Sequence, residues 1–254
     1  MPPLTVHRWG PPDGPPLLLL HGLTDAGTTW PDAVRRWQST YRVIAPDLRG
    51  HGQSPRFADD ELGRCHDLWV ADVLDLLPAG GPAPVIVAHS LGGLLALRAA
   101  IAAPVRVRGL VLEDPAVPTG NPLPDPVFVA DQERFLDSFA DGGAAERARM
   151  RVVSPWSEDE IDAWAAAKPL VDRRMIHHGL TLGEAGWETL FNRLAVPTLL
   201  MLPVGSPMAP DESAVTNPRV RFGWRAGVGH CVRRDDPVAF HRVVDPFLAA
   251  VSSG

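Results

Sequence analysis

The sequence predicts an α/β protein: a doubly wound, mostly parallel sheet flanked by helices, with an inserted helical cap. Short, continuous apolar runs alternate along the chain with longer stretches that are typical of helices. Apolar runs of this kind are expected in a parallel sheet that is covered on both faces. In the middle of the chain, at residues 117–187, no strand-like run is evident and helical stretches replace it.

Strands are expected where apolar runs are bounded by turn residues, at residues 17–21, 42–45, 85–88, 110–113, 198–202 and 220–224. Helices around the sheet are expected at residues 29–38, 65–77, 91–103, 187–194 and 237–250. The last of these begins with Asp236-Pro237, an N-cap aspartate followed by proline at the first helical position.

The middle segment predicts helices at residues 131–140, 144–153 and 157–168. The third opens with Ser157 and Glu160, which have the spacing of a capping box. We therefore divide the chain into an α/β core of residues 1–116 and 188–254 and a helical cap of residues 117–187.

Composition and charge narrow the class of protein. The chain has 254 residues, of which 45% are hydrophobic, and a formal net charge of -6, so no basic footprint for nucleic acid is expected. Two cysteines are too few for a disulfide framework. No segment has the apolar length of a membrane span, and the first residues lack the features of a signal peptide. These features predict a cytoplasmic protein that acts on a small molecule without nucleic acid or membrane, as a monomer or homodimer.

The most informative segment is residues 88–93, Ala-His-Ser-Leu-Gly-Gly, which follows an apolar run and opens an alanine- and leucine-rich stretch. A serine between a strand and a helix, with small residues two positions away on each side, is typical of a nucleophile elbow. This turn exposes the hydroxyl of Ser90 and directs the backbone N–H of Leu91 toward the same point. Such an N–H group can stabilise an oxyanion.

Three further segments accompany this one in a particular order. An apolar run ends in His21-Gly22-Leu23, residues 47–52 read Asp-Leu-Arg-Gly-His-Gly, and residues 227–231 read Gly-Val-Gly-His-Cys. Together with the elbow, these segments make the chain resemble the α/β-hydrolase-fold superfamily over nearly its whole length. The resemblance implies a serine hydrolase with a helical cap, in which the chain order of the catalytic groups is serine, acid, histidine.

A serine hydroxyl is a weak nucleophile and needs an adjacent base. Among nine histidines, His230 is the candidate, because it lies in a glycine-rich loop after a strand and downstream of Ser90. The backbone N–H of Leu23 is the candidate for the second oxyanion donor, beside that of Leu91.

The acid has two candidates. The resemblance places an aspartate after the strand at residues 198–202, but Ser206 stands there, and a serine cannot stabilise an imidazolium by charge. Asp114 ends the strand that is predicted beside that of Ser90, a place from which relatives resembling haloalkane dehalogenases take their acid. Asp211 lies farther along a proline-rich loop. We favour Asp114, since a strand end is held more rigidly than such a loop, and Asp211 stays open.

Contacts with the substrate are expected from His21 and from the cap residues Trp156 and Trp164. His21 is also placed to shape the oxyanion loop. The cap aromatics could equally form a small core of their own, but some of them should face the cleft, because small-molecule sites are mostly apolar.

The function predicted is a cofactor-independent serine hydrolase that cleaves a small, fairly apolar carboxylic ester or lactone. A serine at the elbow implies acyl transfer, and no dinucleotide loop or zinc spacing is present. Two alternatives remain: a C–C hydrolase or perhydrolase of the same fold, or a ligand-binding protein that has lost turnover.

Overall fold

The computed structural model describes residues 2–118, 125–180, 182–183 and 186–252. These residues form a seven-stranded sheet in the order β1-β3-β2-β4-β5-β6-β7. The strands are β1 Val6–Trp9, β2 Pro16–Leu20, β3 Arg42–Pro46, β4 Val85–His89, β5 Gly109–Glu113, β6 Thr198–Pro203 and β7 Val220–Arg225. All neighbours pair in parallel except β1, which runs antiparallel to β3 at the edge. The predicted α/β fold is confirmed.

The central strands are buried on both faces, which explains their continuous apolar sequences. Every residue of β2, β4, β5 and β6 is buried. Successive side chains of a strand point to opposite faces. Accordingly, Leu18 and Leu20 belong to one hydrophobic cluster, whereas Leu17 and Leu19 belong to the cluster on the other face.

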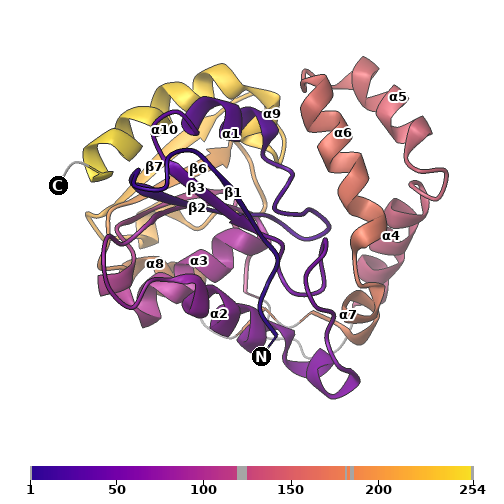
Figure 1. Cartoon of the computed structure of the whole chain (residues 1–254), viewed down its shortest axis with the longest axis horizontal. Coiled ribbons are helices and arrows are strands. Elements are labelled where there is room, and N and C mark those ends of the chain that lie inside the picture. Colours follow the sequence, from indigo (N-terminus) through magenta and orange to yellow (C-terminus); the bar gives the residue numbers. More distant parts are fainter. Residues whose placement is uncertain (1, 119–124, 181, 184–185, 253–254) are drawn as a thin grey trace.

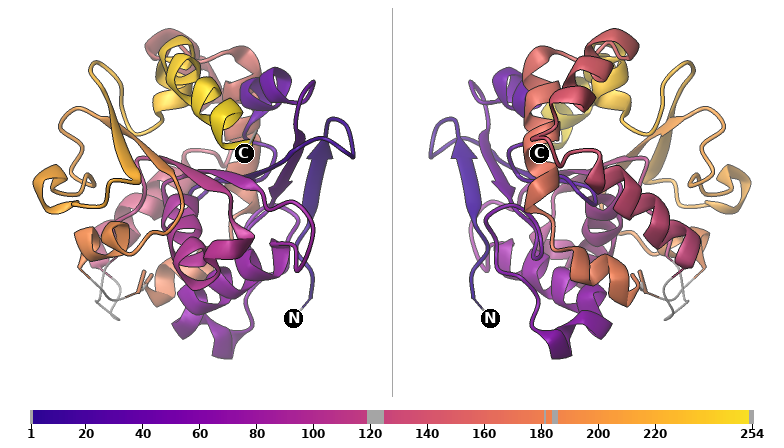
Figure 2. Two further views of the ribbon diagram at one scale, coloured as in Figure 1. Left: turned by 90° about the vertical axis from the view of Figure 1, so that its left-hand side faces the viewer. Right: turned by 90° about the vertical axis from the view of Figure 1, so that its right-hand side faces the viewer.

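Helices cover both faces of this sheet (Figures 1 and 2). One face packs against α2 Cys65–Leu76, α3 Leu91–Ala102 and α8 Trp187–Asn192. The other packs against α1 Pro31–Trp37, α9 Val232–Asp235 and α10 Pro237–Ser252. Short 3-10 helices are Asp59–Arg64, Pro104–Arg106, Lys168–Leu170 and Glu212–Ala214.

The remaining helices are α4 Pro126–Asp137, α5 Ala144–Val153, α6 Glu158–Ala167 and α7 Arg173–His178. We call these four the cap helices; Figure 1 shows α4, α5 and α6 beside the sheet rather than on either of its faces. Helices α5 and α6, with Phe139 in the turn after α4, form a separate hydrophobic cluster around Ile161 and Trp164. The division of the chain at residues 117 and 187 stays a proposal, and Trp187 itself belongs to the cluster of the sheet face.

The structure differs from the sequence prediction at several elements. Strand β1 and helix α7 were not predicted, and α4 begins at Pro126 rather than at residue 131. Only half of the predicted capping box forms: Ser157 Oγ accepts from the N–H of Glu160, while the Glu160 side chain turns to Arg234. No helix in the described part of the chain is long and apolar enough to cross a membrane.

Candidate active site

Ser90 lies at the turn between β4 and α3, in a strained backbone conformation. Its φ of 51° and ψ of -118° are unusual for a residue other than glycine. Two hydrogen bonds hold this turn: Ser90 N–H donates to the carbonyl of Glu113 at 3.0 Å, and Ala116 N–H donates to the carbonyl of Ser90 at 2.9 Å. The strained turn is therefore anchored to the neighbouring strand β5.

The small residues around Ser90 have a steric reason. A Cβ atom at Gly92 would lie 2.4 Å from the carbonyl oxygen of Leu20, and one at Gly93 would lie 2.7 Å from Cβ of Pro115. Both approaches are closer than van der Waals contact allows, so only glycine permits α3 to start this close to β2 and β5.

The loop before α9 brings His230 to the end of β5. His230 Nδ1 donates to Asp114 Oδ2 at 2.7 Å, which leaves Nε2 as the proton acceptor of the ring. The Asp114 side chain is 2% exposed, whereas that of His230 is 41% exposed. The two residues after β4 and β5, Ser90 and Asp114, emerge at the same sheet edge because His89 pairs with Glu113 in the parallel register.

The other candidate acid lies elsewhere. Asp211 is exposed and its carboxylate accepts from the N–H and the hydroxyl of Ser213, at the start of a 3-10 helix. The geometry therefore favours Asp114 over Asp211 as the partner of His230.

The oxygen of Asp114 that His230 does not use also has a partner. Ser206 Oγ donates to Asp114 Oδ1 at 2.6 Å. The backbone of Asp114 has a φ of 39°, and its N–H donates to the carbonyl of Met201 in β6 at 2.9 Å. Sequence reasoning gave Ser206 no role, although its place after β6 was a usable signal.

His89 is buried beside His230, with ring centroids 4.5 Å apart. Its Nε2–H donates to the backbone carbonyl of His230 at 3.2 Å. Burial, together with the nearby His230, holds the pKa of His89 well below its ordinary value. The His89 ring is therefore uncharged and holds the loop of His230 through this hydrogen bond. It is too weak a base to take the proton of Ser90 in place of His230.

The two predicted oxyanion donors, Leu23 and Leu91, line the same cavity as Ser90 and His230. Leu91 is the first residue of α3, so its N–H belongs to the four that have no partner within the helix. The loop carrying Leu23 closes through a bond from Asp25 N–H to the carbonyl of Gly22 at 3.2 Å.

His21 is not among the described residues that line the cavity. Its Nε2 accepts from the N–H of Leu48 at 2.9 Å, and its Nδ1–H donates to the carbonyl of Gly22 at 2.8 Å. This buried ring links the loops after β2 and β3, so its position supports the predicted role in shaping the oxyanion loop and not contact with substrate.

A cavity of about 730 Å³ opens above Ser90. On the cap side, the cavity is lined by one face of α4, which carries Phe128, Val129, Gln132 and Phe135. Residues of the segment after α7 complete this side of the lining. The spacing of three or four residues along α4 is that of one helix face. Of the lining residues that the structure describes, Asp125 is the one acidic side chain and none is lysine or arginine.

Trp156 and Trp164, which were expected to contact substrate, do not line this cavity in the described part of the chain. Trp164 packs in the cap cluster against Phe139, at a centroid distance of 4.9 Å. Trp156 Nε1 donates to Asp235 Oδ1 at 2.6 Å. Both indoles therefore serve contacts of the cap with itself and with α9, so their positions do not support contact with substrate. Aromatic content alone does not show which way a side chain points.

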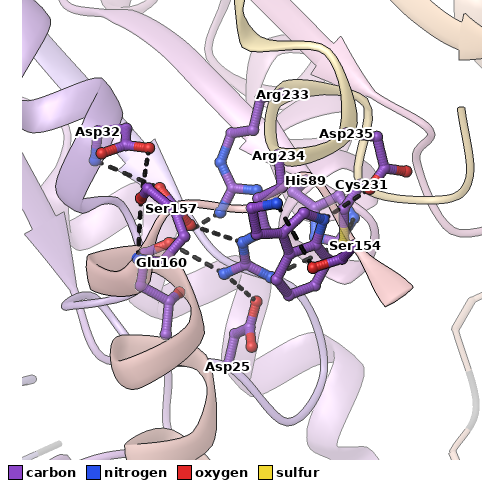
Figure 3. Close-up of polar contacts among 12 residues, drawn as sticks. Asp25, Asp32, His89, Ser154, Ser157, Glu160, Cys231, Arg233, Arg234 and Asp235 are labelled. Carbon is purple, nitrogen blue, oxygen red and sulfur yellow. Dashed lines mark hydrogen bonds and ion pairs between the residues drawn. The ribbon is translucent and has the colours of Figure 1, made fainter. Parts of the chain in front are cut away.

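Figure 3 shows the polar contacts where α6 meets α9. Arg234 is buried and donates to Glu160 at 2.7 Å and to Asp25 at 3.2 Å. Asp25 also accepts from Lys168, which is buried too. Burial alone would raise the pKa of Asp25, but Lys168 and Arg234 outweigh it and lower that pKa below its usual value. This network joins the cap to the loop of Leu23 and to the helix after His230.

Asp235 provides a second link between the cap and the His230 loop. Its Oδ2 accepts from the N–H of Gly229 at 2.7 Å, while its Oδ1 accepts from Trp156. We predict that Trp156→Phe, which removes only the N–H donor, lowers kcat for small and large substrates by the same factor, about threefold to tenfold. The control is Trp224→Phe, which removes an N–H bond to Glu212 on the surface. Steady-state kinetics that show an altered ranking of substrates would restore Trp156 to a role in specificity.

Comparison with known proteins places this fold and site in a family. The alpha/beta hydrolase family model matches residues 17–243. The chain is 31% identical to lipase LipV of Mycobacterium tuberculosis over 201 residues, 78% of this chain and 69% of that protein. It is 43% identical to a 2-hydroxymuconate semialdehyde hydrolase of Pseudomonas putida over 255 residues, 93% of this chain and 88% of that protein.

Solved structures agree on the fold. The N-formylmaleamic acid deformylase of Pseudomonas putida S16 superposes with a TM-score of 0.73 at 21% identity, covering 94% of each chain. The chain belongs to the alpha/beta hydrolase family, and it is a hydrolase.

Proposed function

We propose that this protein is a cofactor-independent serine hydrolase that cleaves apolar carboxylic esters or lactones. The observation that carries the proposal is the bond from His230 to the buried carboxylate of Asp114, in an apolar cavity that Ser90, at its strained elbow, also lines. A serine becomes a nucleophile when a base is adjacent and a third group orients that base.

The chemistry follows from these positions. Ser90 Oγ attacks the carbonyl carbon as its proton passes to His230 Nε2, and Asp114 stabilises the imidazolium that forms. The N–H groups of Leu23 and Leu91 stabilise the oxyanion. His230 then gives its proton to the leaving alcohol, which departs and leaves an acyl group on Ser90. Water, deprotonated by His230, hydrolyses this ester and restores Ser90.

The cavity supports a neutral, bulky substrate. About 730 Å³ is within the range of small-molecule sites, and most of the wall is aliphatic or aromatic. Ser90 and His230 lie on the core side of the cavity, whereas the face of α4 lies on the cap side. We infer that this helix face contacts the acyl or alcohol group of the substrate.

A C–C hydrolase is the second candidate, because 43% identity to a 2-hydroxymuconate semialdehyde hydrolase extends over nearly the whole chain. The semialdehyde of a muconic acid carries a carboxylate, which a site usually binds through arginine or lysine. The lining residues that the structure describes include neither, and they include Asp125. The cavity therefore supports the ester proposal better.

A substrate panel separates the two candidates. The purified protein is assayed with p-nitrophenyl acetate, butyrate and octanoate, with a δ-lactone, and with 2-hydroxymuconate semialdehyde. We expect the highest kcat/KM for an ester of intermediate or long acyl chain. A kcat/KM for the semialdehyde that exceeds those of all esters by tenfold or more would reject the ester proposal in favour of C–C hydrolysis.

The face of α4 offers a mutational test of the substrate site. Phe128→Ala enlarges the cavity, so we expect the ratio of kcat/KM for octanoate to that for acetate to change by about tenfold, the effect of one or two buried methylene contacts. Val127→Ala is the matched control, because Val127 lies on the same turn and is 69% exposed. An unchanged ratio in Phe128→Ala would place the acyl chain elsewhere.

We also propose that the protein is located in the cytoplasm, a reducing compartment. Both cysteines, Cys65 and Cys231, are unpaired, and burial raises the pKa of their thiols, to about 12 and about 11. Unpaired, protonated thiols suit a compartment in which disulfides are rare.

A further inference from the structure

The side chain of Ser206 contacts the oxygen of Asp114 that His230 does not use. Ser206 Oγ donates to Oδ1 at 2.6 Å, and His230 Nδ1 donates to Oδ2 at 2.7 Å. Asp114 therefore receives one hydrogen bond at each carboxylate oxygen, from residues that lie 92 and 116 positions away in the sequence.

The carboxylate needs both bonds because it is almost fully buried. The Asp114 side chain is 2% exposed, and a buried charge is costly when its oxygen atoms lack partners. A short bond from a hydroxyl to an ionised oxygen is stronger than a neutral one. Without it, the carboxylate is free to rotate, and its plane no longer holds one oxygen in line with the bond from His230.

Ser206 is itself fixed in orientation. It lies in the turn after β6, where its N–H donates to the carbonyl of Pro203 at 3.1 Å and Gly205 adopts a φ of 82°. Ser206 Oγ accepts from the N–H of Met208 at 3.1 Å. A serine hydroxyl has one proton, so with this acceptor contact occupied, the proton is directed at Asp114.

We propose that Ser206 is a positioning residue of the hydrolytic reaction: it fixes the carboxylate plane of Asp114, so that Oδ2 faces His230 when the imidazolium forms. This inference rests on the proposed function. Ser206 touches neither the substrate cavity, in the described lining, nor the reacting atoms, so its effect should appear in kcat and not in KM.

The test is a double-mutant cycle with Ser206→Ala and Asp114→Asn. Each single variant, the double variant and the unaltered protein are assayed with p-nitrophenyl butyrate. The rate of inactivation by a fluorophosphonate is followed over hours, which extends the measurable range for the slow variants. If Ser206 acts through the charge of Asp114, its removal matters only where that charge is present.

We expect Ser206→Ala alone to lower kcat and the inactivation rate about 10-fold to 100-fold, the effect of a hydrogen bond to a charged group. KM should stay within about twofold. In the Asp114→Asn background the same change should have no effect or raise the rate slightly, because Ser206 there holds the amide with its NH₂ group toward His230. Ser206→Thr, which keeps the hydroxyl, should restore most of the rate.

Ser213→Ala is the matched control, since Ser213 also donates to an aspartate, Asp211, but both residues are exposed and neither is among the described residues that line the cavity. Equal losses from Ser206→Ala in both backgrounds would show a merely structural role, and no loss in either would show no role. Both outcomes overturn the inference and leave the proposed function intact, because that function is tested separately, by the substrate panel and by the variants of Ser90 and His230.

Discussion

Ser90→Ala should lower kcat for p-nitrophenyl esters about 10⁶-fold, close to the effect of removing a whole catalytic triad, because the members of a triad act as a unit. The residual rate would come from the oxyanion donors and from binding alone. The variant should fold, since alanine keeps the Cβ atom and loses one oxygen.

A second substitution at this position separates activity from stability. Ser90 has a φ of 51°, which glycine adopts without strain, so Ser90→Gly should be equally inactive but more stable than Ser90→Ala, by about 1 kcal/mol. Kinetics and thermal unfolding measure the two effects. Activity within tenfold of the unaltered protein in either variant would exclude Ser90 as the nucleophile.

Asp114→Asn should lower kcat about 10⁴-fold, the cost of losing the acid that orients the histidine of a triad. The reason is geometric as well as electrostatic. Ser206 donates to one oxygen of this side chain, so the amide oxygen of asparagine is expected to face Ser206. The NH₂ group then faces His230 and forces the proton onto Nε2, the nitrogen that must accept it from Ser90.

Asp211→Asn is the control for this prediction, because Asp211 is exposed and caps a 3-10 helix. Asparagine can cap the 3-10 helix in the same way, so the kcat of Asp211→Asn should differ less than twofold from that of the unaltered protein. Asparagine also tolerates the positive φ of Asp114, so a folding defect is not expected there. If Asp211→Asn were instead the slower enzyme, the catalytic acid would be Asp211, in the loop after β6.

Much of the fold could be predicted because its strands are buried on both faces. Apolar runs marked β2, β3, β4, β5 and β6, and the alternation of Val220, Phe222 and Trp224 with other residues marked β7, each to within one or two residues. The edge strand β1 was not predicted because it has only four residues, Val-His-Arg-Trp, with two polar residues in the middle, and none of them is buried. Helix α7 was not predicted because it is only six residues long and depends on an N-cap from Asp172.

The candidate acid could be inferred because parallel neighbours bring their ends to one edge. The place of Ser206 after β6 was visible in the sequence, but the loop conformation that turns its hydroxyl toward Asp114 was not. The cap wall was missed because α4 was predicted to begin at residue 131, after Phe128 and Val129. The orientation of Trp164 was predictable in principle: Ile161, Trp164 and Ala165 have the spacing of one helix face, and all three pack in the cap cluster.

Acyl transfer by this protein requires that His230 activate Ser90. To measure this activation, the purified protein is treated with a fluorophosphonate probe and the adduct is mapped by peptide mass spectrometry. We expect one stoichiometric adduct on Ser90, formed within minutes and lost in His230→Ala. No adduct, or an adduct on another residue, would exclude this role of Ser90 and would favour a ligand-binding protein without turnover.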